Sequence, residues 1–98
     1  MKLKEGDKVY IIIVHVSEPP ELEIVEVTNI GFDYFYCNPI IGNIKLYLLH
    51  KRIDALDFSK LIDIHCDAAL SFPIYFTTNE VIAMKKYEHL LDKYENRR

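Results

Sequence analysis

The chain has 98 residues, of which 50% are hydrophobic and 12% aromatic, and its formal net charge is −3. This length and composition predict one domain, residues 1–98, with a single hydrophobic core. The negative charge gives no general attraction to nucleic acid or to an anionic membrane. No run approaches the roughly 18 apolar residues of a membrane-spanning helix, and residues 1–6 lack an apolar signal core, so we expect a cytoplasmic protein without membrane contact.

The run VYIIIVHV, residues 9–16, is the most apolar and β-branched stretch of the chain. Both of its alternating faces are apolar, which is typical of a strand buried on both sides. Gly6 and Asp7 supply turn chemistry before it. We therefore expect a central strand over residues 8–16, with one face inside a small barrel and the other covered by the C-terminal segment.

Turn residues divide the next part of the chain into further expected strands, which cover residues 22–30, 32–37, 44–49 and 61–65. The apolar face of the first of these changes between Ile24 and Val25, which predicts a β-bulge at that point. Residues 72–76 are expected to form a short extended segment. Because proline lacks a backbone N–H, Pro73 predicts that this segment lies at a sheet edge or in an isolated bridge.

The C-terminal segment predicts a helix over residues 78–95. Thr77 and Glu80 have the spacing of a capping box, with the threonine as N-cap residue. Six apolar residues fall within about 120° of arc on this helix, namely Ala83, Met84, Tyr87, Leu90, Leu91 and Tyr94. We expect this stripe to pack on the outer face of the first strand, or to join two copies in a homodimer if stripe and strand do not meet in one molecule.

Several short motifs carry a resemblance to a known class of proteins. The sequence GDKVY at residues 6–10 opens a strand, VEVTNIG at residues 25–31 ends the next, and YFY at residues 34–36 follows. With the segment at residues 74–77 and a helix starting at Glu80, this pattern resembles small SH3-like β-barrel proteins of phages and prophages. The resemblance implies an accessory protein, and some small phage proteins bind and block host defence factors.

The expected fold is therefore mainly β: a small SH3-like barrel or strongly bent antiparallel sheet of about five strands over residues 5–76, followed by one C-terminal helix. A barrel of this size suits two other functions. It can bind a small ligand or nucleotide in a pocket between barrel and helix, or across a dimer interface, lined by tyrosine and histidine. It can also bind nucleic acid, if exposed aromatic rings stack on bases.

Nucleic acid is the less favoured of these partners. Residues 6–9 resemble the opening of a KOW-type barrel, which implies RNA or ribosomal partners, but the glycines that follow in such barrels are missing before Gly31. Base stacking normally comes with interleaved basic residues. The only such group near the aromatic strands is Lys45, Lys51 and Arg52.

No motif predicts an enzyme or a cofactor. The chain lacks a phosphate loop, a dinucleotide fingerprint and a nucleophile elbow. The densest polar cluster contains Asp63, His65, Cys66 and Asp67, but neighbouring residues of a strand point to opposite faces, so we expect no metal; a metal-dependent activity centred on His65 is the remaining alternative. Cys37 continues an aromatic strand and is interpreted as a buried thiol, reduced like Cys66.

Two groups of residues are candidates for binding a protein. Residues 18–26 contain four glutamates and no basic residue, which favours docking on a basic partner. Three tyrosines lie on strands that are expected to face one another, where exposed rings can grip a peptide. The predicted partner-binding residues are Glu18, Glu21, Glu23, Glu26, Tyr34, Tyr36 and Tyr47. A non-enzymatic protein-interaction module is therefore the leading hypothesis.

Overall fold

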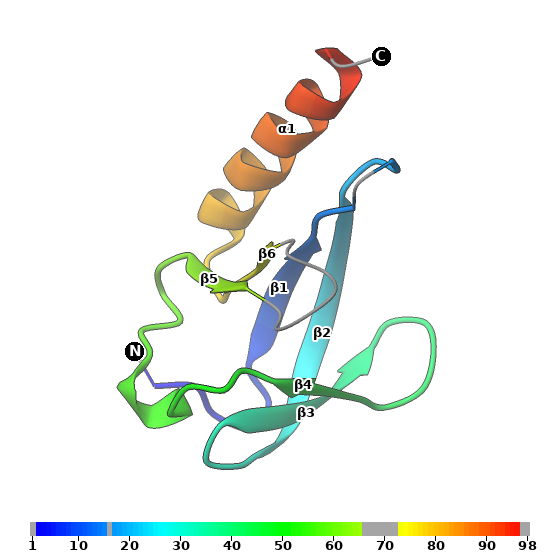
Figure 1. Ribbon diagram of the computed structural model, residues 1–98. Helices are drawn as coiled ribbons and strands as arrows, with labels where there is room; N and C mark the ends of the chain where they lie inside the picture. The colour runs from blue at the N-terminus through cyan, green and yellow to red at the C-terminus, as the bar shows by residue number, and fades with distance from the viewer. Residues whose placement is uncertain (1, 16, 66–72, 97–98) are drawn as a thin grey trace.

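The computed structural model describes residues 2–15, 17–65 and 73–96, and it shows a six-stranded antiparallel sheet followed by one α-helix (Figure 1). The elements are β1 (Lys8–Ile13), β2 (Glu21–Ile30), β3 (Tyr34–Pro39), β4 (Lys45–Leu48), β5 (Ile62–His65), β6 (Pro73–Thr77) and α1 (Glu80–Asn96). The strand order in the sheet is β4-β3-β2-β1-β6-β5. The predicted mainly β fold with a C-terminal helix is confirmed, and the strongly bent sheet is the form observed.

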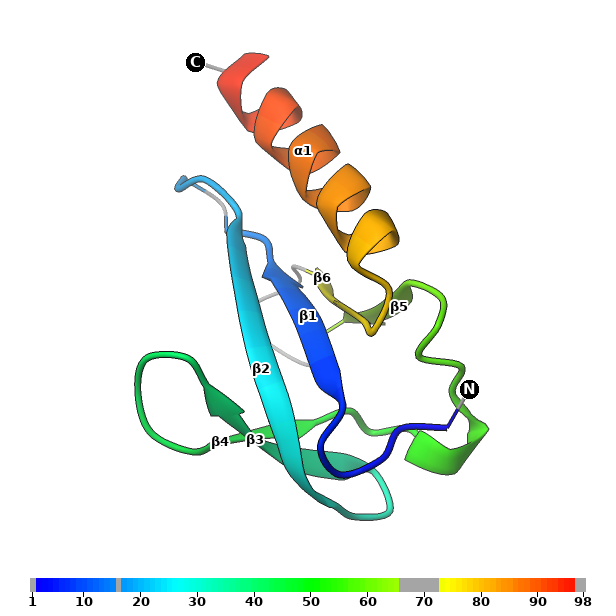
Figure 2. The same cartoon turned by 180° about the vertical axis from the view of Figure 1, so that it is seen from behind.

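The sheet curls into an open half-barrel (Figures 1 and 2). Three strands separate β4 from β6, so in a flat sheet the two would lie about 19 Å apart. Their side chains nevertheless meet, because the ring centroids of Tyr47 and Phe76 are 5.5 Å apart. Phe35 of β3 likewise lies 6.0 Å from Phe76 and 6.5 Å from Phe58. The curl therefore closes the concave face of the sheet around an aromatic core.

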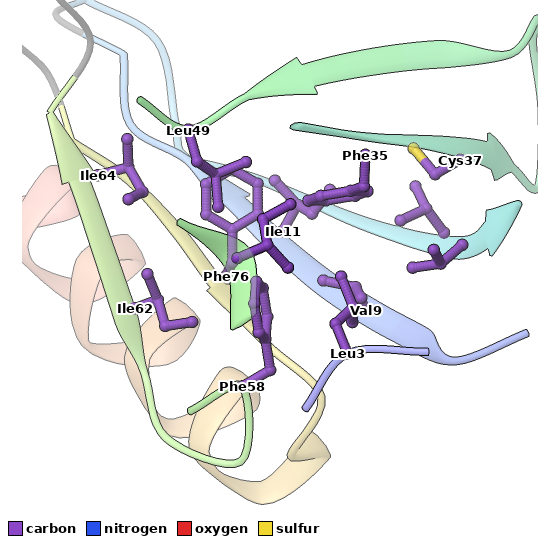
Figure 3. Close-up of a cluster of buried hydrophobic side chains, with 13 residues drawn as sticks. Leu3, Val9, Ile11, Phe35, Cys37, Leu49, Phe58, Ile62, Ile64 and Phe76 are labelled. Carbon is purple, nitrogen blue, oxygen red and sulfur yellow. The ribbon is translucent and has the colours of Figure 1, made fainter. Parts of the chain in front are cut away.

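β1 is buried on both faces, as the sequence predicts. Val9 and Ile11 belong to the core on the concave side (Figure 3), whereas Tyr10 and Ile12 are buried on the convex side. The strand ends at Ile13, earlier than predicted, because β2 and β6 pair with it only up to that residue. The two covering layers expected for this strand are both present.

The convex layer is α1, whose first turns lie against β1 and β6 before its axis leads away from the sheet (Figures 1 and 2). Ala83 is fully buried, and Glu80 Oε2 accepts a hydrogen bond from the Tyr10 hydroxyl at 3.3 Å. The rest of the predicted stripe is half-buried, while the opposite face of the helix is exposed at Lys85, His89 and Asp92. The predicted orientation of the helix is confirmed.

The start of the helix differs from the prediction. Asn79 is the N-cap residue, since its Oδ1 accepts hydrogen bonds from the backbone N–H groups of Val81 at 3.0 Å and Ile82 at 3.3 Å. Thr77, the predicted N-cap, is fully buried and donates its hydroxyl to the Phe58 carbonyl at 3.2 Å. The prediction is wrong because β6 continues through Thr77, which places this side chain in the sheet.

The β-bulge in β2 also lies elsewhere. The register of the β2–β3 pairing shifts at Thr28, and not between Ile24 and Val25 as predicted. The extra residue at Thr28 turns Ile30 toward the core on the concave side, where it packs. No change of face is needed at Ile24, because β2 carries apolar side chains on both of its faces up to the bulge.

β6 is an interior strand, so the prediction of an edge segment or isolated bridge is wrong. It lies between β1 and β5 and brings the number of strands to six rather than about five. Pro73 is the first residue of β6 and pairs with the last residue of β5, His65. At that position the missing N–H of proline disturbs the ladder least.

Candidate interaction surface

The β3–β4 hairpin has one buried face and one exposed face. Phe35 and Cys37 point into the core and are fully buried. The alternate residues turn to the convex side, where Tyr36 stands opposite Leu46. We call the apolar residues of this side and of the adjoining loop the exposed hairpin surface: Tyr34, Tyr36, Ile40, Ile41, Ile44, Leu46 and Leu48.

The exposed hairpin surface is large for a small chain. Six of its residues are among the most exposed large apolar side chains, from 38% of the side chain at Tyr36 to 90% at Ile41. Large apolar patches, about 300–600 Å² on typical monomers, are often functional, so six such side chains on one hairpin are a candidate for binding. The helix leaves this part of the convex side uncovered (Figures 1 and 2).

Two tyrosines give this surface a fixed aromatic centre. The rings of Tyr34 and Tyr36 pack edge to face, with centroids 5.9 Å apart and an interplanar angle of 84°. The Tyr34 ring also lies directly over Gly31, and a side chain at Gly31 would collide with it. The structure therefore brings together two of the predicted binding residues, Tyr34 and Tyr36. The absence of a side chain at Gly31 leaves the space that the Tyr34 ring occupies.

Tyr47 and Glu23, two other predicted binding residues, lie on the concave side. Glu23 accepts hydrogen bonds from Lys45 Nζ at 2.9 Å and from the Tyr47 hydroxyl at 3.1 Å. Burial, together with the charge of Glu23, raises the pKa of Tyr47, and the hydrogen bond to Glu23 raises the pKa of Lys45. Both side chains thus keep their protons at neutral pH and are engaged within the chain.

The four predicted glutamates do not share one surface. Glu21 and Glu23 stand opposite Ile13 and Ile11 and point to the concave side, whereas alternation turns Glu26 to the convex side. Glu18 precedes the strand and is exposed. Binding of a partner by these residues stays a prediction.

The described residues offer little for catalysis or metal binding. Cys37 is a free thiol, and burial together with the Glu23 charge raises its pKa to about 11, so at neutral pH it is a poor nucleophile. No group of three or more histidine, cysteine or acidic side chains among the described residues is placed to hold a metal ion. The predicted cluster around His65 lies partly outside the described residues, because it includes Cys66 and Asp67.

Two surface hollows bear on the ligand-binding alternative. The larger, about 450 Å³, lies between the start of β1 and the neighbouring parts of β2 and β3, and includes Lys8, Ile24 and Pro39. The smaller, about 210 Å³, lies at the β2–β3 turn beside Phe32. Neither hollow is lined by a tyrosine, a histidine or a residue of α1, which are the features that the ligand-binding alternative requires.

The basic group that a nucleic acid would contact is already partly paired. Lys45 Nζ lies 2.9 Å from Glu23 Oε1, and Arg52 Nη2 lies 2.8 Å from Asp54 Oδ2. Phosphate binding depends on cations that are free to replace counterions. Two of the three basic residues therefore contribute less to such binding than the sequence alone indicates.

Searches of protein-family models, curated proteins and solved structures find no match to this chain. Within the described ranges, no helix combines the length and the apolar character needed to cross a lipid bilayer. The function is therefore inferred from the geometry of the chain itself.

The sequence predicted two tyrosines of the exposed hairpin surface, Tyr34 and Tyr36, but not its aliphatic residues. Leu46 and Leu48 alternate with inward-facing residues, and alternation alone does not reveal which side is covered. Ile40 and Ile41 carry a clearer signal, since they lie in the turn region before Gly42, where side chains are normally at the surface.

Proposed function

We propose that this chain is a cytoplasmic, non-enzymatic protein-interaction module, an SH3-like accessory protein of phage or prophage origin that binds or inhibits a host protein. The observation that carries the proposal is the exposed hairpin surface on the convex side of β3 and β4. The core on the concave side is complete without these residues. Binding to a partner would bury them, and burial of apolar area is the main driving force for protein association.

The composition of this surface fits the centre of a protein interface. Its seven residues are tyrosine, isoleucine and leucine, with no charged member, and interface centres are depleted of charge and enriched in aromatic rings. Lys45, which stands between Ile44 and Leu46 in the sequence, bonds to Glu23 on the other side of the sheet. The packed pair of Tyr34 and Tyr36 supplies large, ordered side chains of the type that dominate binding energy.

A polar border adjoins this apolar centre. Glu26 stands opposite Asn38 in the β2–β3 pairing, and both are exposed beside Tyr36. A rim of this kind contributes to orientation and association rate more than to affinity. The exposed Lys8 stands opposite Glu26 in the β1–β2 pairing, so this border offers a partner both an acidic and a basic group.

Capture of a host protein by the full chain tests the proposal. We would immobilise the protein through a C-terminal tag, incubate it with bacterial lysate, and quantify retained proteins by mass spectrometry. The double variant Tyr36→Lys with Leu48→Lys places two charges in the interface, where burial of unpaired charge is costly. We expect the wild type to retain one host protein in near-stoichiometric amount and this variant to retain at least about tenfold less.

The matched control is Val81→Lys, which changes an apolar side chain on α1 that is 62% exposed and should leave capture unchanged. Reversing Glu18, Glu21 and Glu26 to lysine measures the acidic contribution separately. Equal capture by the wild type and the double variant, or no capture by the wild type, would overturn the proposal.

A further inference from the structure

β4 forms an edge of the sheet whose backbone groups are available for pairing. Among the described residues, its only neighbouring strand is β3. The Leu49 N–H donates to the Asp33 carbonyl at 2.8 Å, and this pair continues the β3–β4 register. Hydrogen-bonded and non-hydrogen-bonded pairs alternate along an antiparallel ladder. The N–H and C=O groups of Leu46 and Leu48 therefore point away from β3.

Natural sheet edges are protected by very short strands, prolines, bulges or charges. β4 is short, with 4 residues, but the other protections are weak on it. β4 contains no proline, and its pairing with β3 has no register shift. Its single charged residue, Lys45, is held on the concave side by Glu23 at 2.9 Å. The opposite edge, β5, instead carries the exposed carboxylate of Asp63.

We propose that two copies of this chain pair through β4 in an antiparallel arrangement, with the two-fold axis at Leu46. A two-fold interface requires that a surface complement itself. With the axis at this residue, Leu46 stands opposite Leu46 of the second copy, and Leu48 stands opposite Ile44. All three residues have the same parity, so their outward backbone groups meet and their side chains share the convex side.

The position of the axis follows from the ends of the strand. Moving it by one residue toward the C-terminus sets Ile44 opposite His50 of the second copy. His50 has a φ of 58°, a left-handed conformation that cannot continue an extended strand. Centring on Leu46 instead brings together on the convex side apolar residues that are 50–63% exposed.

A second copy is favoured over an unrelated strand because hydrogen-bonding pattern and side-chain character both match under one symmetry operation. The pairing would join the two exposed hairpin surfaces into a continuous apolar strip across the axis. Stable interfaces bury about 800 Å² on each partner, more than a four-residue strand provides. We therefore expect a dimer that forms in the micromolar range. This inference goes beyond the proposed function and does not depend on it.

Sedimentation velocity on the full chain tests the proposal. The wild type and two variants of Leu46 are compared from low micromolar to near-millimolar concentration. Leu46→Ala removes apolar area and keeps the backbone N–H. Leu46→Pro also removes the outward N–H, with no loss of a hydrogen bond to β3. We expect the alanine variant to dimerise at most about tenfold more weakly and the proline variant to remain monomeric, whereas Val81→Arg on α1 should dimerise like the wild type.

Hydrogen exchange on the wild type gives a second reading that needs no substitution. The amides of Leu46 and Leu48 should exchange rapidly in dilute protein and slowly in concentrated protein, while the Tyr47 amide stays protected at both concentrations. A wild type that is monomeric throughout, or a dimer in which these two amides remain unprotected, would overturn the inference. If the protein is monomeric but captures a host protein, the dimer inference fails and the proposed function stands. If it dimerises but captures no host protein, only the proposed function fails.

Discussion

The two faces of the β3–β4 hairpin are made from alternate residues of the same strands, yet their environments are opposite. Phe35 is fully buried, whereas its neighbour Tyr36 is 38% exposed; Leu49 is 1% exposed, whereas Leu48 is 50% exposed. Leu48 and Leu49 are the same residue type, and Phe35 and Tyr36 are both aromatic, so residue type does not explain the contrast. The direction in which the sheet curls decides which of them enter the core.

The same contrast divides the convex side of the sheet. Over β1 and β6, the first turns of α1 bury Tyr10 and Ile12. Over β3 and β4, no described element lies on the apolar residues (Figure 2). One half of the convex side therefore contributes to folding, and the other half remains available for association.

Replacing neighbouring residues on the two faces of β3 gives the largest expected difference. Phe35→Ala should lower the free energy of unfolding by about 3–5 kcal/mol, because it leaves a cavity between the rings that contact Phe35. Tyr36→Ala should cost about 1 kcal/mol or less, because its ring is partly exposed and loses mainly the contact with Tyr34. Urea unfolding of both variants, with equal m-values, measures the difference; similar losses would show that Tyr36 is part of the core.

The buried thiol of Cys37 tests how well the concave side of the hairpin is closed to solvent. Its pKa is raised from 9.0 to about 11, so at pH 8 the folded protein should contain about a hundredfold less Cys37 thiolate than the unfolded chain. In a Cys66→Ser background, reaction with a disulfide reagent should therefore be at least that much slower in native buffer than in urea. Comparable rates in both conditions would mean that the hairpin opens readily.

The same raised pKa predicts a pH dependence of stability. Because the folded state holds the thiol proton more tightly, its contribution is fully present below about pH 9 and is lost as the pH rises toward 11. Cys37→Ala should remove this part of the alkaline destabilisation. Unfolding curves at pH 8 and pH 10.5, compared between the two proteins, isolate this contribution.

Local patterns were sufficient to predict the central strand and the helix that covers it. The β-branched run of β1 and the apolar stripe of α1 each require a particular partner surface, and the structure pairs them as expected. Details that depend on which segment pairs with which were not predictable in this way. Thr77 has the properties of a helix cap, but the pairing of β6 with β1 draws it into the sheet.

The candidate surface illustrates the same limit. Alternation shows that Tyr34 and Tyr36 share a side and that Tyr47 belongs to the register of Phe35. It does not show which side faces the core, because that depends on the curl of the sheet and on where α1 ends its coverage. The glutamates of residues 18–26 are close in sequence but do not share one side of the sheet. Glu21 and Glu23 point to the concave side and Glu26 to the convex side, because alternate strand residues point to opposite sides.

The smallest expected effect concerns two tyrosine hydroxyls on opposite sides of the hairpin. Tyr47→Phe removes the hydroxyl that donates to Glu23 at 3.1 Å and should lower the free energy of unfolding by about 1 kcal/mol. Tyr34→Phe, on the convex side, should change it by less than about 0.5 kcal/mol. Thermal or urea unfolding at pH 7 measures both values, and equal values would mean that the Glu23 network adds nothing to stability.

The difference between the wild type and Tyr47→Phe should also depend on pH. Burial and the charge of Glu23 raise the pKa of Tyr47 above its ordinary value of 10.0. Because the folded state then holds the phenol proton more tightly than the unfolded chain does, the advantage of the wild type over Tyr47→Phe is constant below pH 10 and shrinks above it. An advantage that persists unchanged at pH 11 would mean that the folded protein holds the Tyr47 proton no more tightly than the unfolded chain does.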